Sequence, residues 1–305
     1  MGRRQKWRKQ EMRHALLTAI IVVMLALSAQ AATRPFIADK SGDEVLQSLI
    51  STKTPKFTVK TFRDDITELS IQYNIYLPDE YSAEKKYPAV FFMADGSAAG
   101  KAPSFSLTQG YGALVWPEDC IVVVPTYPEM ILDDHNGLVI TDYVWMTERF
   151  VRWALKNYSI DTSRVYATGQ SMGCMTWLIL SAQNPGLFTA CLFVSGQWDI
   201  TALQGLREQK FVYVASLGDD KASAGQQEVI DMLTSANLPY VWYRNIDAKN
   251  PNVNIPAGQS QSFITFLAGS TLPEGIKGNY SDHMTSFDYA YKIQSVIEWL
   301  LSQRK

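Results

Sequence analysis

A serine held between two glycines has the clearest chemical potential in this chain. Residues 169–173 read Gly-Gln-Ser-Met-Gly and place the serine at position 171. The apolar segment 164–168 precedes them, and an apolar segment of helical length, 174–182, follows. A tight turn from strand to helix exposes the serine hydroxyl, and flanking glycines keep Cβ atoms away from the packed neighbours. The sequence therefore predicts that Ser171 is a nucleophile.

A serine hydroxyl is a weak nucleophile until an adjacent base accepts its proton. Of the three histidines in the chain, only His283 follows Ser171, whereas His135 lies upstream of it. A Gly-x-Ser-x-Gly turn between a strand and a helix is the nucleophile elbow of α/β-hydrolases. In that fold the acid, and then the histidine, follow the serine along the chain. We therefore predict that His283, in the polar stretch 280–284, is the base.

The acid that orients the histidine should follow a strand between the serine and the histidine. The apolar run 211–215 leads into Ser-Leu-Gly-Asp-Asp at 216–220, as such a strand end would. Counting from the strand end favours Asp219 as the acid, with Asp220 as the alternative. Asp199, after the preceding strand, is better interpreted as a helix N-cap.

Ester and amide hydrolysis by a serine also requires two backbone N–H groups that stabilise the oxyanion. One should belong to Met172, directly after the nucleophile, and the other to Gly96 or Ser97, in the loop after the first buried strand. Asp95 lies in the same loop, where it is either structural or alters the electrostatic field near the site. The candidate residues of the substrate cleft are Asp95, Gln170 and Trp198.

The elements that must position these residues are short apolar strands alternating with helices. The predicted strands are 67–77, 89–93, 121–124, 165–168, 190–194, 211–215, 240–243 and 262–267. The predicted helices lie near 44–50, over 142–158, over 174–182 and from about 286 to 303. Continuously apolar strands are buried on both faces, whereas the alternation in 67–77 is typical of an antiparallel strand. The pattern predicts an α/β fold, a mostly parallel sheet with helices on both faces.

The N-terminal 31 residues differ in composition from the rest of the chain. Six basic residues precede the apolar run 15–29, and alanines at 29 and 31 form a small-residue cleavage site. The run is shorter than the roughly 20 residues of a membrane span. We therefore expect a cleaved signal peptide over 1–31 and a secreted or periplasmic protein, with an uncleaved anchor as the alternative. An N-terminal extension over 32–60 and a catalytic domain over 61–305 would follow.

Charge and cysteine content narrow the function classes. Residues 1–31 hold six of the 28 Lys and Arg and one of the 30 Asp and Glu, so the remaining chain carries a net charge near −7. Nucleic-acid binding is therefore not expected, nor is stable membrane association after signal cleavage. The three cysteines lie in apolar contexts and are interpreted as buried thiols, with a disulfide as the alternative. No zinc-ligand set is present, so no metal or cofactor is expected.

Residues 69–300 resemble the secreted α/β-hydrolases of the esterase D, feruloyl esterase and polyhydroxybutyrate depolymerase group. They are also similar to bacterial peptidases with a prolyl-oligopeptidase-like fold. The motifs that carry the resemblance are Tyr76-Leu77-Pro78, the block 160–173, Gly218-Asp219 and His283 before an aromatic-rich helix. The resemblance implies the α/β-hydrolase fold and a triad of Ser171, Asp219 or Asp220, and His283. Two positions depart from the pattern: Asp95 replaces a histidine before Gly96, and Cys174 replaces a second glycine.

These features together predict a secreted serine hydrolase that cleaves carboxylic esters through an acyl-enzyme intermediate. A serine peptidase acting on small peptides is the alternative, and an inactive α/β-hydrolase used for binding is a third interpretation. The expected partner is a small-molecule or polysaccharide-linked ester, the latter by family analogy alone.

Overall fold

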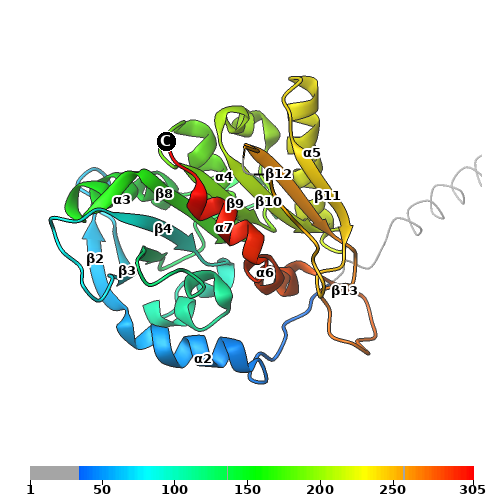
Figure 1. Cartoon of the computed structure of the whole chain (residues 1–305), viewed down its shortest axis with the longest axis horizontal. Coiled ribbons are helices and arrows are strands. Elements are labelled where there is room, and N and C mark those ends of the chain that lie inside the picture. The colour runs from blue at the N-terminus through cyan, green and yellow to red at the C-terminus, as the bar shows by residue number, and fades with distance from the viewer. Residues whose placement is uncertain (1–33, 136, 257) are drawn as a thin grey trace, which may run out of the picture. The chain divides into compact units, whose positions relative to one another are not determined.

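The computed structural model describes residues 34–135, 137–256 and 258–305 (Figure 1). The expected signal peptide, 1–31, lies outside the described residues. The chain divides into two compact units, Met1–Arg34 with Lys277–Tyr280 and Pro35–Ile276 with Ser281–Lys305. In the described part of the first unit, the Arg34 guanidinium lies 5.9 Å from the centroid of the Tyr280 ring. The candidate site belongs to the second unit.

The second unit is built on a sheet of nine strands among the described residues. In order across the sheet, these are β11 (Val241–Ile246), β12 (Gln261–Phe266), β10 (Phe211–Ser216), β9 (Ala190–Val194), β8 (Ile160–Gln170), β4 (Tyr87–Met93), β5 (Ile121–Thr126), β3 (Ser70–Tyr76) and β2 (Thr58–Arg63). The strands from β11 to β5 are parallel, and β3 and β2 add antiparallel pairs at one edge. The predicted mostly parallel sheet is confirmed.

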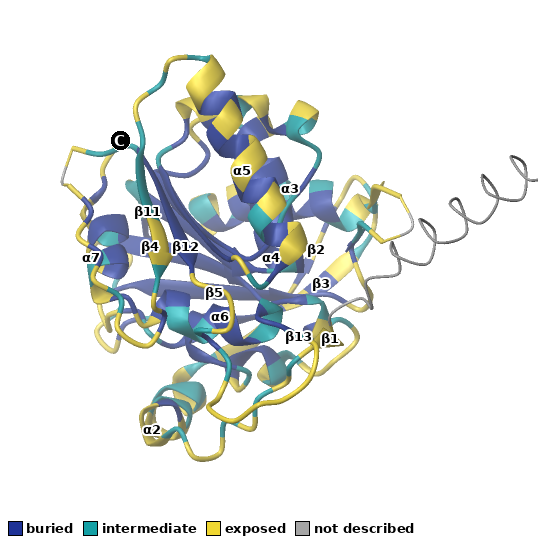
Figure 2. Cartoon of the chain, turned by 90° about the vertical axis from the view of Figure 1, so that its right-hand side faces the viewer, coloured by how far each residue is buried: buried dark blue, intermediate teal, exposed yellow. Residues whose placement is uncertain are grey.

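Helices cover both faces of this sheet, so the core has two layers (Figure 2). One face packs against α3 (Asp142–Asn157), α4 (Met172–Gln183), α5 (Asp220–Ser235) and the 3-10 helix η5 (Ile200–Glu208). The other packs against α2 (Glu44–Lys53), α6 (His283–Tyr291) and α7 (Gln294–Ser302). Side chains alternate between the layers, because successive Cβ atoms of a strand point to opposite faces. In β4, Phe91 joins the first layer and Phe92 the second.

Shorter elements complete the chain. They are the 3-10 helices η1 (Thr54–Lys56), η2 (Gly96–Ala98), η3 (Pro103–Leu107) and η4 (Tyr111–Ala113), and the two-residue strands β1 (Arg34–Pro35), β6 (Leu132–Asp133), β7 (Val139–Ile140) and β13 (Tyr280–Ser281). β6 pairs with β7 in an antiparallel ladder. Within the described ranges, no helix has the length and apolar content that a membrane span requires.

Two expectations about elements were wrong. The single closing helix is two helices, because the backbone of Ile293 is extended (φ −77°, ψ 95°) and interrupts the ladder between α6 and α7. The first of the two, α6, begins at His283, three residues before the expected helix start near residue 286. Strand β2 was not predicted; it begins at Thr58, before the expected domain start at residue 61. Only Phe62 of this edge strand is buried, so no apolar pattern marks it.

Candidate active site

Ser171 lies at a strained turn between β8 and α4. Its backbone has φ 50° and ψ −117°, a conformation that non-glycine residues rarely adopt. The flanking glycines are required by space, because a Cβ on Gly173 would lie 2.1 Å from the carbonyl oxygen of Met93. A Cβ on Gly169 would lie 2.7 Å from the carbonyl carbon of Gly173. The turn therefore has the geometry expected of a nucleophile elbow.

The structure brings Ser171, His283 and Asp219 into one hydrogen-bonded chain. Nε2 of His283 lies 2.9 Å from Oγ of Ser171, and Nδ1 lies 2.5 Å from Oδ2 of Asp219. An Nδ1–H that donates to the carboxylate leaves Nε2 as the acceptor for the serine hydroxyl. The three side chains come from the start of α4, the start of α6 and the loop after β10. This arrangement can transfer a proton from the serine to the histidine during nucleophilic attack.

The two adjacent aspartates after β10 have different surroundings. Asp219 is 6% exposed and, besides contacting His283, caps α5 by accepting the N–H of Ala222 at 3.4 Å. Asp220 is the exposed first residue of α5. The structure thus places Asp219, and not Asp220, against the histidine. Asp199 caps η5, as expected, by accepting the N–H of Thr201.

Asp95 organises the loop that was expected to supply an oxyanion donor. Its Oδ1 accepts the N–H of Ser97 at 2.9 Å, and its Oδ2 accepts Nε2–H of Gln170 at 2.8 Å. Ser97 therefore already donates its N–H to a carboxylate. Within the described ranges, no hydrogen bond satisfies the N–H of Gly96 or of Met172, the first residues of η2 and α4. These two donors remain available for an oxyanion.

The candidate cleft residues separate into two groups. Asp95 and Gln170 line a cavity of about 220 Å³. Trp198 is 5% exposed and packs in the layer of α3, α4 and α5. The apolar ring of Trp198 therefore acts as a core residue in this structure.

The cysteines are free and buried. Burial raises the pKa of Cys120 and of Cys191 to about 12 and raises the pKa of Cys174, in the elbow helix, further. A thiol with so high a pKa stays protonated near neutral pH, so these cysteines are poor nucleophiles there.

Sequence reasoning missed a buried carboxylate next to the histidine. Asp282 is 1% exposed, and its Oδ2 accepts hydrogen bonds from Oγ of Ser216 at 2.6 Å and from the N–H of Gly269 at 2.8 Å. Its own N–H donates to the carbonyl of Gly218 at 3.1 Å. Asp282 therefore ties the start of α6 to the loops after β10 and β12. Its place beside His283 in the chain was the only sequence signal.

A pair of hydroxyls forms a second link to the histidine segment. Ser286 Oγ donates to the carbonyl oxygen of His283 at 2.8 Å, and it lies 2.7 Å from Oγ of Ser195. Since the single hydroxyl proton of Ser286 is used, Ser195 is the donor in that second contact. Ser195 follows β9 and has a φ of 46°, so its backbone is also held in the left-handed region.

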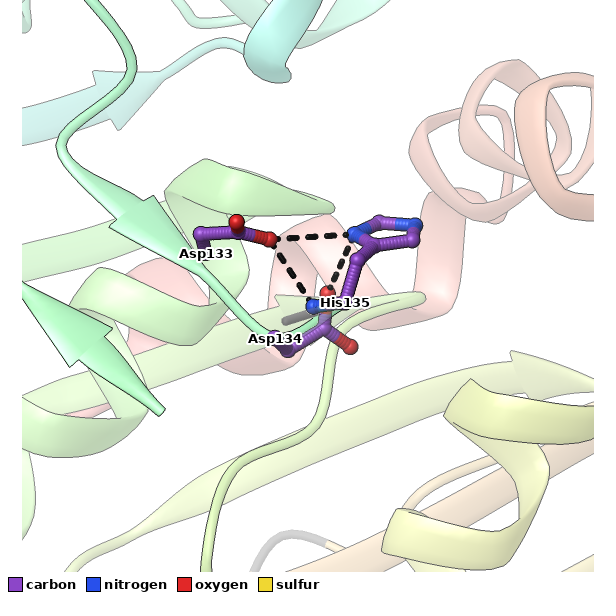
Figure 3. Close-up of side chains that lie close together, drawn as sticks. All are labelled: Asp133, Asp134 and His135. Atoms are coloured by element: carbon purple, nitrogen blue, oxygen red, sulfur yellow. Dashed lines mark hydrogen bonds and ion pairs between the residues drawn. The ribbon is translucent and has the colours of Figure 1, made fainter. Parts of the chain in front are cut away.

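Asp133, Asp134 and His135 offer ligand atoms within 4.8 Å of one another. Figure 3 shows the His135 ring beside both carboxylates, with Nδ1 3.3 Å from Asp133 Oδ1 and 3.0 Å from Asp134 Oδ1. Lys221 Nζ lies 3.0 Å from Asp134 Oδ2, which also accepts a hydrogen bond from Gln197. The cluster is therefore an ion-paired junction between the chain at the end of β6, the loop after β9 and the first turn of α5, in which the Lys221 ammonium group already neutralises the Asp134 carboxylate.

Comparison with known proteins relates this geometry to esterases. The Esterase family model, described as "Putative esterase", matches residues 65–255. The chain is 26% identical over 169 residues to "Probable acetylxylan esterase A" of Aspergillus clavatus, covering 51% of this chain and 52% of the relative. It is 26% identical over 170 residues to "Acetylxylan esterase A" of Emericella nidulans, covering 48% and 53%. The chain thus spans about half the length of the curated relatives it matches.

The fold is similar to that of a solved thermostable esterase, with a TM-score of 0.66 and 22% identity over 83% of this chain and 64% of that one. Together with the strand order, this similarity confirms the predicted α/β-hydrolase fold. Because the family model matches more than half of the chain, the protein belongs to the Esterase family.

Proposed function

We propose that the protein is a serine hydrolase that cleaves carboxylic esters through an acyl-enzyme intermediate. In this proposal Ser171 is the nucleophile, His283 the general base and acid, and Asp219 the carboxylate that orients it. The main support is the hydrogen-bonded chain from Ser171 Oγ through both ring nitrogens of His283 to Asp219. Membership of the Esterase family supports ester bonds as the target.

The first half of the proposed reaction forms the acyl-enzyme. Oγ of Ser171 bonds to the carbonyl carbon while Nε2 of His283 takes the hydroxyl proton, and Asp219 stabilises the resulting imidazolium. The carbonyl oxygen becomes an oxyanion. The tetrahedral intermediate then collapses, the ester C–O bond breaks, and the alcohol leaves with the proton from Nε2. Water attacks in the second half, gives its proton to His283, and releases the carboxylic acid as Ser171 is reprotonated.

We assign the oxyanion donors to the N–H groups of Met172 and Gly96. Gly96 is preferred over Ser97 because the Asp95 carboxylate accepts the N–H of Ser97. Two preorganised N–H groups stabilise charge that develops only in the transition state. Loss of one such donor typically lowers kcat by about 10²–10³.

The substrate proposed for this site is an ester carried by a polysaccharide. Its support is the similarity to two proteins named acetylxylan esterase A. A polymeric substrate cannot enter a cell, which fits the proposal of a signal peptide over residues 1–31 and a secreted or periplasmic protein.

The proposal is tested by labelling with a fluorophosphonate probe and by hydrolysis of p-nitrophenyl acetate. We expect wild type to be labelled and active, Ser171→Ala to lose both properties, and Ser235→Ala to keep both. Ser235 is an exposed serine at the end of α5 remote from Asp220, so it is a matched control. Equal labelling of wild type and Ser171→Ala would exclude Ser171 as the nucleophile. Faster turnover of peptide amides than of esters would favour the peptidase alternative.

A further inference from the structure

The cavity of about 220 Å³ lies beside the proposed triad, because two of its walls come from the triad's own segments. Gln170, which precedes the nucleophile in the chain, lines one wall. Met284 and Phe287, from the first turns of α6, line the second. The Phe287 ring is edge-on to the ring of His283, with centroids 5.1 Å apart. A group bound in this cavity would therefore contact residues that adjoin Ser171 and His283 in the chain.

A third wall is formed by residues 37–40, which the sequence assigned to an extension outside the catalytic domain. The segment passes below α6 in Figure 1 on its way to α2. Lys40 Nζ lies 2.6 Å from Oδ2 of Asp288 and donates to the carbonyl of Gln109 at 2.5 Å. Asp43 Oδ2 lies 2.9 Å from Nζ of Lys292. The N-terminal segment supplies the cation of the first ion pair and the anion of the second. Because a shifted segment would bring like charges together, the two pairs fix its position along α6.

The lining of the cavity is suited to hydroxyl groups. The side-chain amides of Gln109 and Gln170 and the hydroxyl of Ser97 offer both donors and acceptors, whereas the hydroxyl of Thr108 already donates its proton to the carbonyl of Phe105. The volume of about 220 Å³ is below the roughly 300–1,000 Å³ of sites for drug-sized ligands. The cavity therefore fits one small polar unit rather than a long apolar chain.

The charge of the lining disfavours anions. Asp39 and Asp95 contribute two carboxylates, and the ammonium of Lys40, the cation of the lining, is already paired with Asp288. Asp95 is 3% exposed, so its charge is poorly screened by solvent. A negatively charged ligand brought into this cavity would be repelled by these two carboxylates, because the described residues of the lining hold no unpaired cation to compensate its charge.

We propose that the cavity binds an uncharged, hydroxylated unit of the ester substrate. Residues 37–40 form the wall that sets its size and its selectivity against anionic units. This inference rests on the proposed function. It makes the N-terminal segment a specificity element of the same active site.

The test compares two sugar acetates that differ in one group, 2-O-acetyl methyl glucoside and 2-O-acetyl methyl glucuronoside, with p-nitrophenyl acetate as a small reference. For wild type we expect kcat/KM to be at least tenfold higher for the neutral sugar acetate than for the anionic one. Asp39→Asn removes a carboxylate from the wall while keeping an acceptor for the N–H of Ser41, and should narrow that ratio at least threefold.

Ala38→Trp should fill the cavity and raise KM for the neutral sugar acetate at least tenfold, with less than a twofold change for p-nitrophenyl acetate. The matched control is Ala83→Trp, an exposed alanine before β4 at the opposite, amino edge of the sheet. We expect this control to leave the KM for all three substrates unchanged. Fluorophosphonate labelling of each variant checks that the nucleophile is intact.

The outcomes separate the two proposals. Absence of labelling and of p-nitrophenyl acetate hydrolysis in wild type would overturn the proposed function. The cavity assignment alone would be overturned if wild type is labelled and hydrolyses p-nitrophenyl acetate normally but shows equal kcat/KM for both sugar acetates. An unchanged KM for the neutral sugar acetate in Ala38→Trp would have the same meaning. Calorimetric binding of the two sugar acetates to Ser171→Ala gives the same comparison without turnover. Equal affinity for both would contradict the proposed selectivity.

Discussion

The Ser216 hydroxyl donates to the Asp282 carboxylate at 2.6 Å, and this bond joins the segment that carries Asp219 to the segment that carries His283. The two segments are far apart in sequence, and the proposed proton transfer depends on their spacing. Asp282 is buried and its Oδ2 also accepts the N–H of Gly269, so a single side chain fastens two loops to the start of α6.

Removal of this link should affect both stability and rate. In Asp282→Ala the hydroxyl of Ser216 and the N–H of Gly269 lose their acceptor in a buried site, at a cost of about 2–4 kcal/mol of unfolding free energy. We expect kcat to fall about 10–100-fold with little change in KM, because the histidine is displaced rather than the substrate site. Asp282→Asn keeps an acceptor oxygen and should recover part of kcat. Asp231→Asn, on the exposed face of α5, is the control; an unaltered kcat in Asp282→Ala would contradict the positioning role.

The choice between the two adjacent aspartates is directly testable. Asp219→Asn should lower kcat by about 10⁴, since an amide favours the wrong tautomer of His283 and cannot stabilise its imidazolium. Asp220→Asn should change kcat less than threefold, because this side chain is exposed at the start of α5. Steady-state kinetics on p-nitrophenyl acetate measures both. A larger loss in Asp220→Asn than in Asp219→Asn would reverse the assignment of the acid.

The elbow should not tolerate a side chain at Gly173. An added Cβ would lie 2.1 Å from the carbonyl oxygen of Met93, and two backbone segments would have to separate to admit it. We expect Gly173→Ala to lose more than about 3 kcal/mol of unfolding free energy or to fail to fold. Gly42→Ala, where no atom lies within 4 Å of the added Cβ, should change stability by less than about 1 kcal/mol. Chemical denaturation of both variants measures the difference; equal stabilities would contradict the packing argument.

Acid should weaken the attachment of α3 to the β2–β3 hairpin. Asp64 accepts two hydrogen bonds from Arg149, at 2.8 and 2.7 Å, and this guanidinium holds the pKa of the Asp64 carboxyl well below its usual range. Because the folded-state pKa is depressed, the pair stabilises the fold fully above the unfolded-state pKa of about 3.9. That stabilisation is lost as pH falls through the lower, folded-state pKa.

We therefore expect Asp64→Asn to cost about 2–3 kcal/mol of unfolding free energy at pH 7. The difference from wild type should shrink steadily as pH falls below about 4. Urea denaturation at a series of pH values measures this difference. Asp79→Asn, an exposed carboxylate with only a surface ion pair to Lys56, is a suitable control. A difference that stays constant down to low pH would show that the charge of Asp64 is not what stabilises the fold.

Much of the fold could be predicted because buried parallel strands are apolar along their whole length. The predicted strand 190–194 agrees with β9 residue for residue, and the elbow helix was placed to within two residues at its start. β2 was missed because an edge strand buries little, and the break at Ile293 was missed because its apolar spacing continues across both closing helices. The spacing of apolar residues indicates which face of an element is buried. It does not show whether the backbone hydrogen bonds of a helix continue without a break.

The sequence by itself determined the glycine-flanked serine, the one histidine downstream of it, and the two aspartates available after β10. These follow from residue type and chain order. Only the tertiary structure decided that Asp219 rather than Asp220 faces His283, that Asp95 engages Ser97, and that residues 37–40 line the cavity. The reason is physical. The orientation of a side chain in a loop depends on helix caps and on hydrogen bonds between segments that are distant in the chain. Local sequence patterns do not encode these contacts.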